Sequence, residues 1–557
     1  MIRCHIEPLG IFVEIEEGET LHAGLEKSGI HIETPCGGNG TCGACRVWVS
    51  PPEKISSTPH ENILPEDDVK GLRLACRTFP MEDISIRLGD NFIHDKADRS
   101  QGKILLHATL SGTIAFNPAA TVTKDGDSFK LWYDRVSEPI LLEDARPSFT
   151  PVGLAVDIGT TTVVVCLVSL VTGEILGTAS SLNPQVIHGH DVLTRILYSK
   201  TREGLEEMAS LIRNKLNSLT RELCLSLNTR QEEIVDGVIG ANTTMLQLAA
   251  QMESASIGRS PFTFDIRGGT LYPAGFFGLN GNKAAKIYLP PILHAYVGTD
   301  ISAGLLVCPD FFDNDKTILF IDMGTNGEIC LNVKGRHYTT STAAGPAFEG
   351  MGVSSGMRAT DGAVEKVEIR DAFFQFHTIN NGPIKGICGS GMVDLIAALL
   401  TSGYLDVSGR LLKKDDPFIV QFNDHLAFQY GDGIYLTQKD IRQIQLAKGA
   451  VRTGMDLIME AGGIGCEDLD KIYVAGGFGN YLQPVHMERI GLIPKNTASK
   501  IMFCGNTSVA GSIALLVNKD RRAFLESALK KMTYLQLAES KAFMGCFLKN
   551  LDFSPEF

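Results

Sequence analysis

The sequence predicts a multidomain chain: a small β-rich domain around a cysteine loop, a short β-containing module, and a large α/β domain built from two similar halves. Three observations predict it. Four cysteines within the first 76 residues have the spacing of a metal-cluster loop. Two similar Asp-x-Gly-Thr patterns begin at Asp157 and Asp322. The length of 557 residues allows several domains, at about 150 residues each.

Residues 1–90 are expected to form the first domain. Short stretches that alternate apolar and β-branched residues with polar ones predict strands at 2–6, 11–15, 47–49, 72–76 and 84–88. Between the second and third of these, residues 20–28 carry leucines at helical spacing, and Thr20 is placed to cap that helix.

The cysteine pattern indicates an iron–sulfur cluster. Three cysteines stand as C-x5-C-x2-C and a fourth follows after thirty intervening residues; they are Cys36, Cys42, Cys45 and Cys76. Four thiolates can hold a 2Fe-2S cluster when three come from one tight loop and the fourth from a distant strand. Four glycines between 37 and 43 suit such a loop. Zinc would more usually show two short cysteine pairs, and disulfides fit poorly with a chain that starts without a secretory signal.

The order of strands, helix and cysteine loop resembles a 2Fe-2S ferredoxin domain with a β-grasp fold, over residues 1 to about 90. The resemblance implies that the four cysteines ligate the cluster. Residues 91–103 are polar and are expected to form a flexible linker. Residues 104–148 alternate around Gly and Asn-Pro turns, which predicts a small β-containing middle module without recognisable chemistry.

From residue 149 onward the pattern changes to long apolar strands. The first hairpin pattern holds Asp157, Gly159, Thr160, Thr161 and Thr162. The second holds Asp322, Gly324, Thr325 and Asn326. A third strand, KIYVA at 471–475, ends in Gly476 and Gly477. The repeat predicts a duplicated fold whose halves face one another across a cleft.

Each of these sequence features can bind one part of a nucleotide. Hydroxyl and N–H groups at a hairpin tip can wrap phosphate oxygens. A carboxylate at the end of each strand can hold Mg²⁺ through water or orient an attacking water, because Mg²⁺ keeps most of its hydration. Glycines after the third strand let adenosine approach the backbone. One copy alone would indicate only a turn, whereas two copies and the glycine-terminated strand indicate an ATP site.

This set resembles the acetate kinase, sugar kinase, Hsp70 and actin superfamily, over residues 149–557. The resemblance implies a large actin-like (ribonuclease H-like) ATPase domain in two halves that binds ATP and Mg²⁺, with Asp157 and Asp322 as the catalytic residues. It implies ATP contacts from Gly159, Thr160, Thr161, Thr162, Gly324, Thr325, Asn326, Gly476 and Gly477. Further glycine-rich stretches at 240–246, 344–363, 386–392 and 504–512 fit the same cleft, or are ordinary turns and helix caps.

Composition also bears on the location of the protein, on its partners and on the state of its other cysteines. No apolar run approaches the roughly 18 residues that span a bilayer, which predicts a soluble cytoplasmic protein. The net charge of −13 argues against nucleic acid as a principal partner, because phosphate binding needs clustered Lys and Arg. The nine cysteines outside the quartet form no second short pair, and most are expected to be reduced thiols in the core.

An N-terminal ferredoxin domain followed by this ATPase resembles the reductive activators of corrinoid proteins, over nearly the whole chain. The resemblance implies ATP-dependent one-electron reduction of an inactive Co(II) corrinoid to Co(I), in an anaerobic methyltransferase or O-demethylase system. It implies two partners, a corrinoid (cobalamin-binding) protein and an electron donor to the cluster, with no nucleic acid and no membrane. Whether the chain forms a homodimer stays an open question, because the middle module is short.

Other classes share the same patterns. A small-molecule kinase fused to a ferredoxin domain would have every nucleotide motif, and a phosphorylated product would identify it. The activators of 2-hydroxyacyl-CoA dehydratases pair this ATPase fold with a shared 4Fe-4S cluster but have no ferredoxin domain. A non-enzymatic redox scaffold would turn over no ATP.

Overall fold

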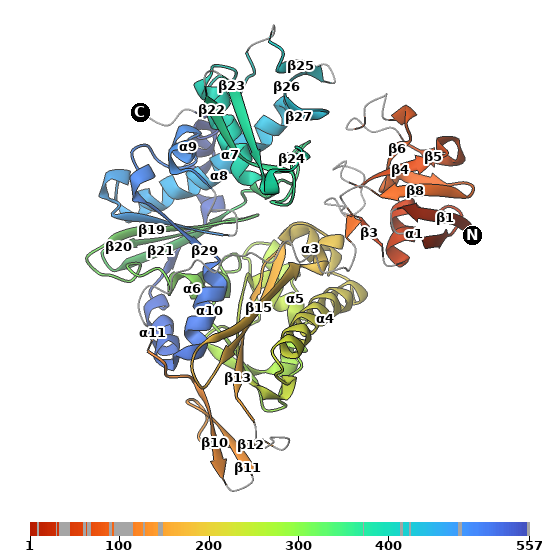
Figure 1. Cartoon of the computed structure of the whole chain (residues 1–557). Helices are drawn as coiled ribbons and strands as arrows, with labels where there is room; N and C mark the ends of the chain where they lie inside the picture. The colour runs from red at the N-terminus through yellow and green to blue at the C-terminus, as the bar shows by residue number, and fades with distance from the viewer. Residues whose placement is uncertain are drawn as a thin grey trace.

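The structure is a computed structural model of the whole chain (Figure 1). It describes residues 1–7, 11–28, 30–32, 45–58, 63, 68–88, 92–93, 115–125, 128–142, 149–370, 373–412, 416–422, 425–476 and 482–553. Cys36, Cys42 and Gly477 lie outside the described residues, as does the predicted linker 91–103 except for 92–93. Within the described part of the chain, no helix is both long and apolar enough to cross a membrane.

The N-terminal domain consists of short strands and one helix. Its elements are β1 (Ile2–Glu7), β2 (Ile11–Ile15), α1 (Leu21–Lys27), β3 (His31–Ile32), β4 (Arg46–Ser50), β5 (Ile55–Ser57), β6 (Leu72–Leu74), β7 (Thr78–Pro80), β8 (Ile84–Leu88) and β9 (Phe92–Ile93). The main sheet has the order β2-β1-β8-β4-β6, with β1 parallel to β8 and every other neighbouring pair antiparallel. Helix α1 packs against this sheet, and the Thr20 hydroxyl accepts a hydrogen bond of 3.2 Å from Ala23 N as its cap. This is the β-grasp fold that the sequence predicts.

A small antiparallel sheet follows, at the bottom of Figure 1. It consists of β10 (Ala120–Asp125), β11 (Ser128–Tyr133) and β12 (Ile140–Leu142). Its inner side chains, Phe129, Leu131 and Tyr133, belong to the same apolar cluster as strands of the next domain. The buried Tyr133 hydroxyl also donates to Val235 O and accepts from Lys286 N. The small sheet therefore shares its core with the ATPase-type domain.

The first half of the large domain has a six-stranded sheet of order β15-β14-β13-β16-β18-β17. Its strands are β13 (Val152–Ile158), β14 (Thr162–Ser169), β15 (Ile175–Leu182), β16 (Ile234–Ala241), β17 (Thr270–Pro273) and β18 (Lys286–Leu289). Its helices are α3 (Val192–Tyr198), α4 (Arg202–Ser226), α5 (Thr243–Ala249) and α6 (Thr299–Leu305). Strands β13 and β16 are apolar and almost entirely buried, as expected for the centre of a sheet covered on both faces.

The second half repeats this arrangement in a sheet of order β29-β28-β19-β20-β21-β30. Its strands are β19 (Thr317–Met323), β20 (Gly327–Val333), β21 (Arg336–Thr342), β28 (Lys471–Ala475), β29 (Ile501–Gly505) and β30 (Thr533–Tyr534). In both halves an antiparallel three-strand meander is continued by a strand parallel to the first, namely β16 beside β13 and β28 beside β19. The predicted duplication is therefore a real repeat of topology.

The remaining elements belong to the second half or return to the first. They are β22 (Ala363–Arg370), β23 (Phe373–Thr378), β24 (Gly386–Ile387), α7 (Gly389–Thr401), β25 (Ile419–Phe422), β26 (His425–Gly431), β27 (Ile434–Thr437), α8 (Gln438–Gly462), α9 (Pro484–Arg489), α10 (Thr507–Val517), α11 (Lys519–Leu529) and α12 (Phe543–Lys549). Helix α10 follows the last long strand of the second half but packs against α6, β13 and β16 of the first (Figure 1). Glycine makes this crossing possible, because a Cβ on Gly511 would lie 2.0 Å from Ala303 O.

Candidate functional site

The two hairpins line one cleft of about 720 Å³ between the halves of the large domain. Every predicted ATP-site residue that the structure describes lies on its wall: Asp157, Gly159, Thr160, Thr161, Thr162, Asp322, Gly324, Thr325, Asn326 and Gly476. Each of the four other glycine-rich stretches also contributes to the wall, through Asn242, Glu349, Ser390 and Ser508 among others. Residues more than 300 positions apart thus meet where the sequence predicts a nucleotide.

The first hairpin connects β13 and β14 through a tight turn. Gly159 N donates to Thr162 O at 2.9 Å, and a Cβ at Gly159 would lie 2.8 Å from that same oxygen, so the turn requires glycine. Arg195, fully buried, donates to Thr160 O from beneath the turn. Asn242 Nδ2 donates to the Thr160 hydroxyl at 3.2 Å. The hairpin tip is therefore held from several sides while its N–H and hydroxyl groups line the cleft.

Asp157 is tied to the start of α10, a helix that comes much later in the chain but packs against the same half of the domain. Its two carboxylate oxygens accept hydrogen bonds of 2.8 Å from Asn506 Nδ2 and from the Ser508 hydroxyl, at the start of α10. Burial raises the pKa of Asp157, whereas these two donors lower it. The glycine-rich stretch 504–512 is recognisable in the sequence, but the roles of Asn506 and Ser508 are not, because their partner is 349 and 351 residues away.

The second hairpin is also closed by a backbone hydrogen bond from its glycine, but to the residue two positions on and not three. Gly324 N donates to Asn326 O at 3.0 Å, and Gly345 N donates to Thr325 O at 2.9 Å. Asp322 closes β19 at the position that Asp157 has in β13. Burial, with the Asp157 carboxylate adding to it, raises the pKa of Asp322 to about 7. The two predicted carboxylates therefore lie near enough to repel each other.

Three carboxylates that the sequence did not reveal complete the acidic wall. Burial, followed by the Asp322 charge, raises the pKa of Asp300 to about 8. Burial also raises the pKa of Glu328, on β20, well above its usual range. Glu349 accepts hydrogen bonds from both hairpins. Spacing could not have identified these residues, since each lies outside the repeated motif.

The wall of the cleft is strongly acidic, so a polyphosphate would bind there together with a cation. Among the described residues on its wall, seven are acidic and Arg358 is the single basic one. No three His, Cys, Asp or Glu side chains in the described part of the chain converge into a group that could hold a metal ion. The acidic wall itself fits a hydrated Mg²⁺, which uses one or two carboxylates, phosphate oxygens and several waters.

Part of the predicted cluster site is visible in the N-terminal domain. Cys45 stands at the start of β4, and Cys76 lies in the short 3-10 turn Ala75–Arg77. The fold brings their sulfur atoms to 3.2 Å, and Ala75 N donates to Cys45 O at 2.8 Å. Two thiols from separate segments thus meet as a cluster requires, and the full set of four ligands stays a prediction.

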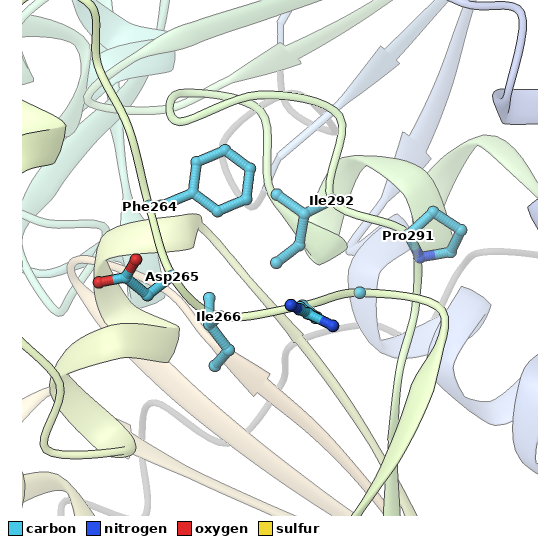
Figure 2. A pocket seen from close by; sticks show the side chains of 7 residues that line it. Phe264, Asp265, Ile266, Pro291 and Ile292 are labelled. Carbon is cyan, nitrogen blue, oxygen red and sulfur yellow. The ribbon is translucent and has the colours of Figure 1, made fainter.

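A second hollow, of about 480 Å³, lies in the first half of the large domain. Figure 2 shows Phe264 and Ile292 facing each other across it, while the Asp265 carboxylate points away. It contains none of the predicted site residues.

Sequence comparison matches three parts of the chain to known families. Residues 316–556 match the model described as "C-terminal domain of RACo the ASKHA domain", and residues 152–309 match "RACo middle region". Residues 4–81 match "2Fe-2S iron-sulfur cluster binding domain". Fold and matches together define a class, an actin-like ATPase joined to a 2Fe-2S ferredoxin domain. The region that the family calls middle is the first half of the ATPase, and the predicted module 104–148 lies before it.

Relatives that match most of the chain give the particular family. "Corrinoid activation enzyme RamQ" of Eubacterium limosum is 33% identical over 418 residues, which are 72% of this chain and 70% of that protein. "[Co(II) methylated amine-specific corrinoid protein] reductase" of Methanosarcina barkeri is 29% identical over 434 residues, 72% of this chain and 77% of that one. A solved structure of a "Reductive activator for corrinoid,iron-sulfur protein" has 29% identity and a TM-score of 0.72, covering 99% of this chain and 98% of that chain. The chain belongs to the family of reductive activators of corrinoid proteins.

Proposed function

We propose that this protein is an ATP-dependent reductase that activates a corrinoid protein by passing one electron to its Co(II) centre and producing Co(I). The observation that carries the proposal is the cleft itself. Two matched hairpins from the two halves of an actin-like domain meet around Glu349, in the same chain as a 2Fe-2S ferredoxin domain. Family membership supports the same reading.

Different residues of the cleft would bind different parts of ATP. Backbone N–H and hydroxyl groups of the two hairpin tips, with Thr161 and Thr325 at their centres, would hold the phosphates. Asp157 and Asp322 would orient the waters of a bound Mg²⁺ or the attacking water. Gly476, together with Gly477, would let adenosine lie against the backbone at the end of β28.

Cys36, Cys42, Cys45 and Cys76 would hold the cluster, which supplies one-electron transfer when bound. Plant-type clusters have potentials near about −400 mV. Every roughly 59 mV by which the Co(II)/Co(I) couple lies lower costs a factor of ten in a one-electron equilibrium. ATP binding or hydrolysis must therefore bias the acceptor or the complex toward transfer.

The partners and the domain limits belong to the same proposal. We expect a corrinoid protein as acceptor and a separate reductant for the cluster, with the option of a homodimer. The proposed domain limits are 1–90 for the cluster domain, 91–103 for the linker, 104–148 for the small module and 149–557 for the ATPase. The cytoplasm is the expected compartment, because reduced thiols need a reducing environment.

The test is spectroscopic. Anaerobic protein, chemically reduced, is mixed with a purified Co(II) corrinoid protein, and Co(I) formation is followed by its visible absorption with ATP, with ADP and without nucleotide. ATP-dependent Co(I) formation is the expected result. Transfer that is equally fast without ATP would contradict the proposal, and so would a small molecule phosphorylated in place of corrinoid reduction.

A further inference from the structure

One carboxylate joins the tips of both hairpins. The Thr161 hydroxyl, in the first half, donates to Glu349 Oε2 at 2.6 Å. The Thr325 hydroxyl, in the second half, donates to Glu349 Oε1 at 2.7 Å. Each oxygen of a single side chain thus binds one half of the domain. These distances are those of strong, charge-assisted hydrogen bonds.

The segment that carries Glu349 is fixed in place by the second half. Glu349 ends the short turn Pro346–Glu349, whose Ala347 and Phe348 are buried in the core of that half. Gly350 follows with φ of +81°, and a Cβ there would lie 2.3 Å from Met357 O. Further along, Ser354 N and its hydroxyl both donate to Asp440 at the start of α8. The side chain therefore reaches the hairpins from a rigid base.

The same two hydroxyls are those expected to bind phosphate oxygens. A carboxylate that bridges them offers the two hydroxyls negatively charged acceptor oxygens, as a terminal phosphate would. A hydroxyl has one proton to donate, so it cannot serve the carboxylate and a phosphate oxygen together. A phosphoryl group that reaches between the hairpin tips must therefore displace Glu349, and a shorter nucleotide need not.

We propose that Glu349 is a specificity residue that distinguishes nucleoside triphosphate from diphosphate, because the terminal phosphate alone competes with its carboxylate for Thr161 and Thr325. This inference rests on the proposed function, since it assumes that the cleft binds ATP, and it adds how the site recognises the third phosphate. With ADP the two halves stay joined by Glu349. With ATP the ligand itself joins them and Glu349 is released.

The test measures binding of ADP and of a non-hydrolysable ATP analogue, with Mg²⁺, to the full-length protein by calorimetry. Glu349→Gln removes the competing charge, so the triphosphate analogue should bind at least about tenfold more tightly than to wild type. ADP should change by less than about twofold, on the same scale of affinities. Glu349→Asp keeps the charge but is too short to span both hydroxyls, and it should fall between. Asp265→Asn is the control, because it removes a carboxylate at the hollow of Figure 2, outside the cleft, and should leave the affinities for both nucleotides unchanged.

Equal changes for both nucleotides, or weaker triphosphate binding to Glu349→Gln, would overturn the inference. Wild-type protein that binds neither nucleotide would overturn it together with the nucleotide site. A change confined to triphosphate affinity would support the role of Glu349 even if the protein reduces no Co(II) corrinoid. Failure of the Glu349 inference and failure of the proposed reductase function can therefore be told apart. The visible spectrum of the cluster and thermal unfolding check that each variant is folded.

Discussion

Gly476 lies against Asp322, since a Cβ on Gly476 would be 3.2 Å from Asp322 Oδ1 and 2.4 Å from Met323 O. Its φ of +101° lies in the region that favours glycine. Strand β28 pairs with β19 in parallel, which brings its glycine end beside the end of the phosphate hairpin strand. Glycine at this position therefore leaves the room that the end of β19 and the Asp322 carboxylate occupy.

Gly476→Ala is expected to weaken ATP binding and lower thermal stability. The new methyl group would have to push the backbone of β19 away, and such overpacking costs about 1–3 kcal/mol. Gly403→Ala is the matched control, because Gly403 also has a positive φ, of +69°, but nothing lies within 4 Å of its Cβ position. Equal losses in the two variants, by calorimetry and thermal melts, would mean that the contact with β19 has no special role.

Asp157→Asn and Asp322→Asn should each reduce ATP-dependent Co(I) formation by at least about tenfold, because loss of either charge disturbs Mg²⁺ or water positioning. The visible spectrum of the cluster should stay the same, since the cluster domain is separate. Asp265→Asn, at the hollow of Figure 2, is the control and should retain full activity. Wild-type rates in both cleft variants would remove the carboxylates from the mechanism.

Anaerobically purified protein should contain two irons per chain with the absorption of a 2Fe-2S centre. Cys45→Ser and Cys76→Ser should each bleach or alter that spectrum, because their sulfur atoms lie side by side. Nucleotide affinity should not change in either variant. Cys466→Ser is the control, because Cys466 lies in the ATPase domain. Zinc in place of iron, or an unaltered spectrum in both variants, would refute the ligand assignment.

Lys448 should make stability depend on pH. This lysine of α8 is buried, donates to Asp552 O and lies 5.6 Å from the centroid of the Phe553 ring. Burial, with Arg452 adding to it, lowers its pKa from 10.5 to about 7, and the charges of Asp552 and Asp456 oppose the shift. Between pH 7 and 10 the unfolded chain binds the extra proton, so stability rises with pH. Below pH 7 both states are protonated and the buried charge costs up to about 5 kcal/mol.

Lys448→Met should therefore be more stable than wild type at pH 6, and its melting temperature should vary less between pH 6 and 9. The exposed Lys530→Met, on the end of α11, should follow the wild-type curve. Melts across this pH range measure the difference. A Lys448→Met curve parallel to that of wild type would show that the amine keeps its ordinary pKa.

Sequence patterns predicted the fold because its signals are local. The β-grasp order, the Thr20 cap, both Asp-x-Gly-Thr hairpins and the glycine end of β28 each depend on residues close together in the chain, and the structure agrees with them. The duplication could also be predicted from the sequence, because a repeated motif can be recognised without knowing the fold of the residues between its copies.

The rest of the site depends on contacts between distant segments. Glu349 stands 188 residues from Thr161, and nothing in the stretch 344–363 distinguishes its carboxylate from a solvent-exposed one. Asp300, on α6, and Glu328, on β20, belong to the site only because the fold places their carboxylates near Asp322. The small sheet β10–β12 shares its core with the first half of the ATPase, which alternation within 104–148 could not reveal.

The hydrogen bond between Asp157 and Asn506 also sets an order of events during synthesis. These residues are 349 positions apart, so at about 5–20 residues per second the first hairpin emerges roughly 17–70 s before its partner is made. The N-terminal domain has all of its predicted cluster ligands by residue 76, long before the cleft can close around a nucleotide. A nascent or prematurely ended chain would therefore be redox-competent before it could couple that chemistry to ATP.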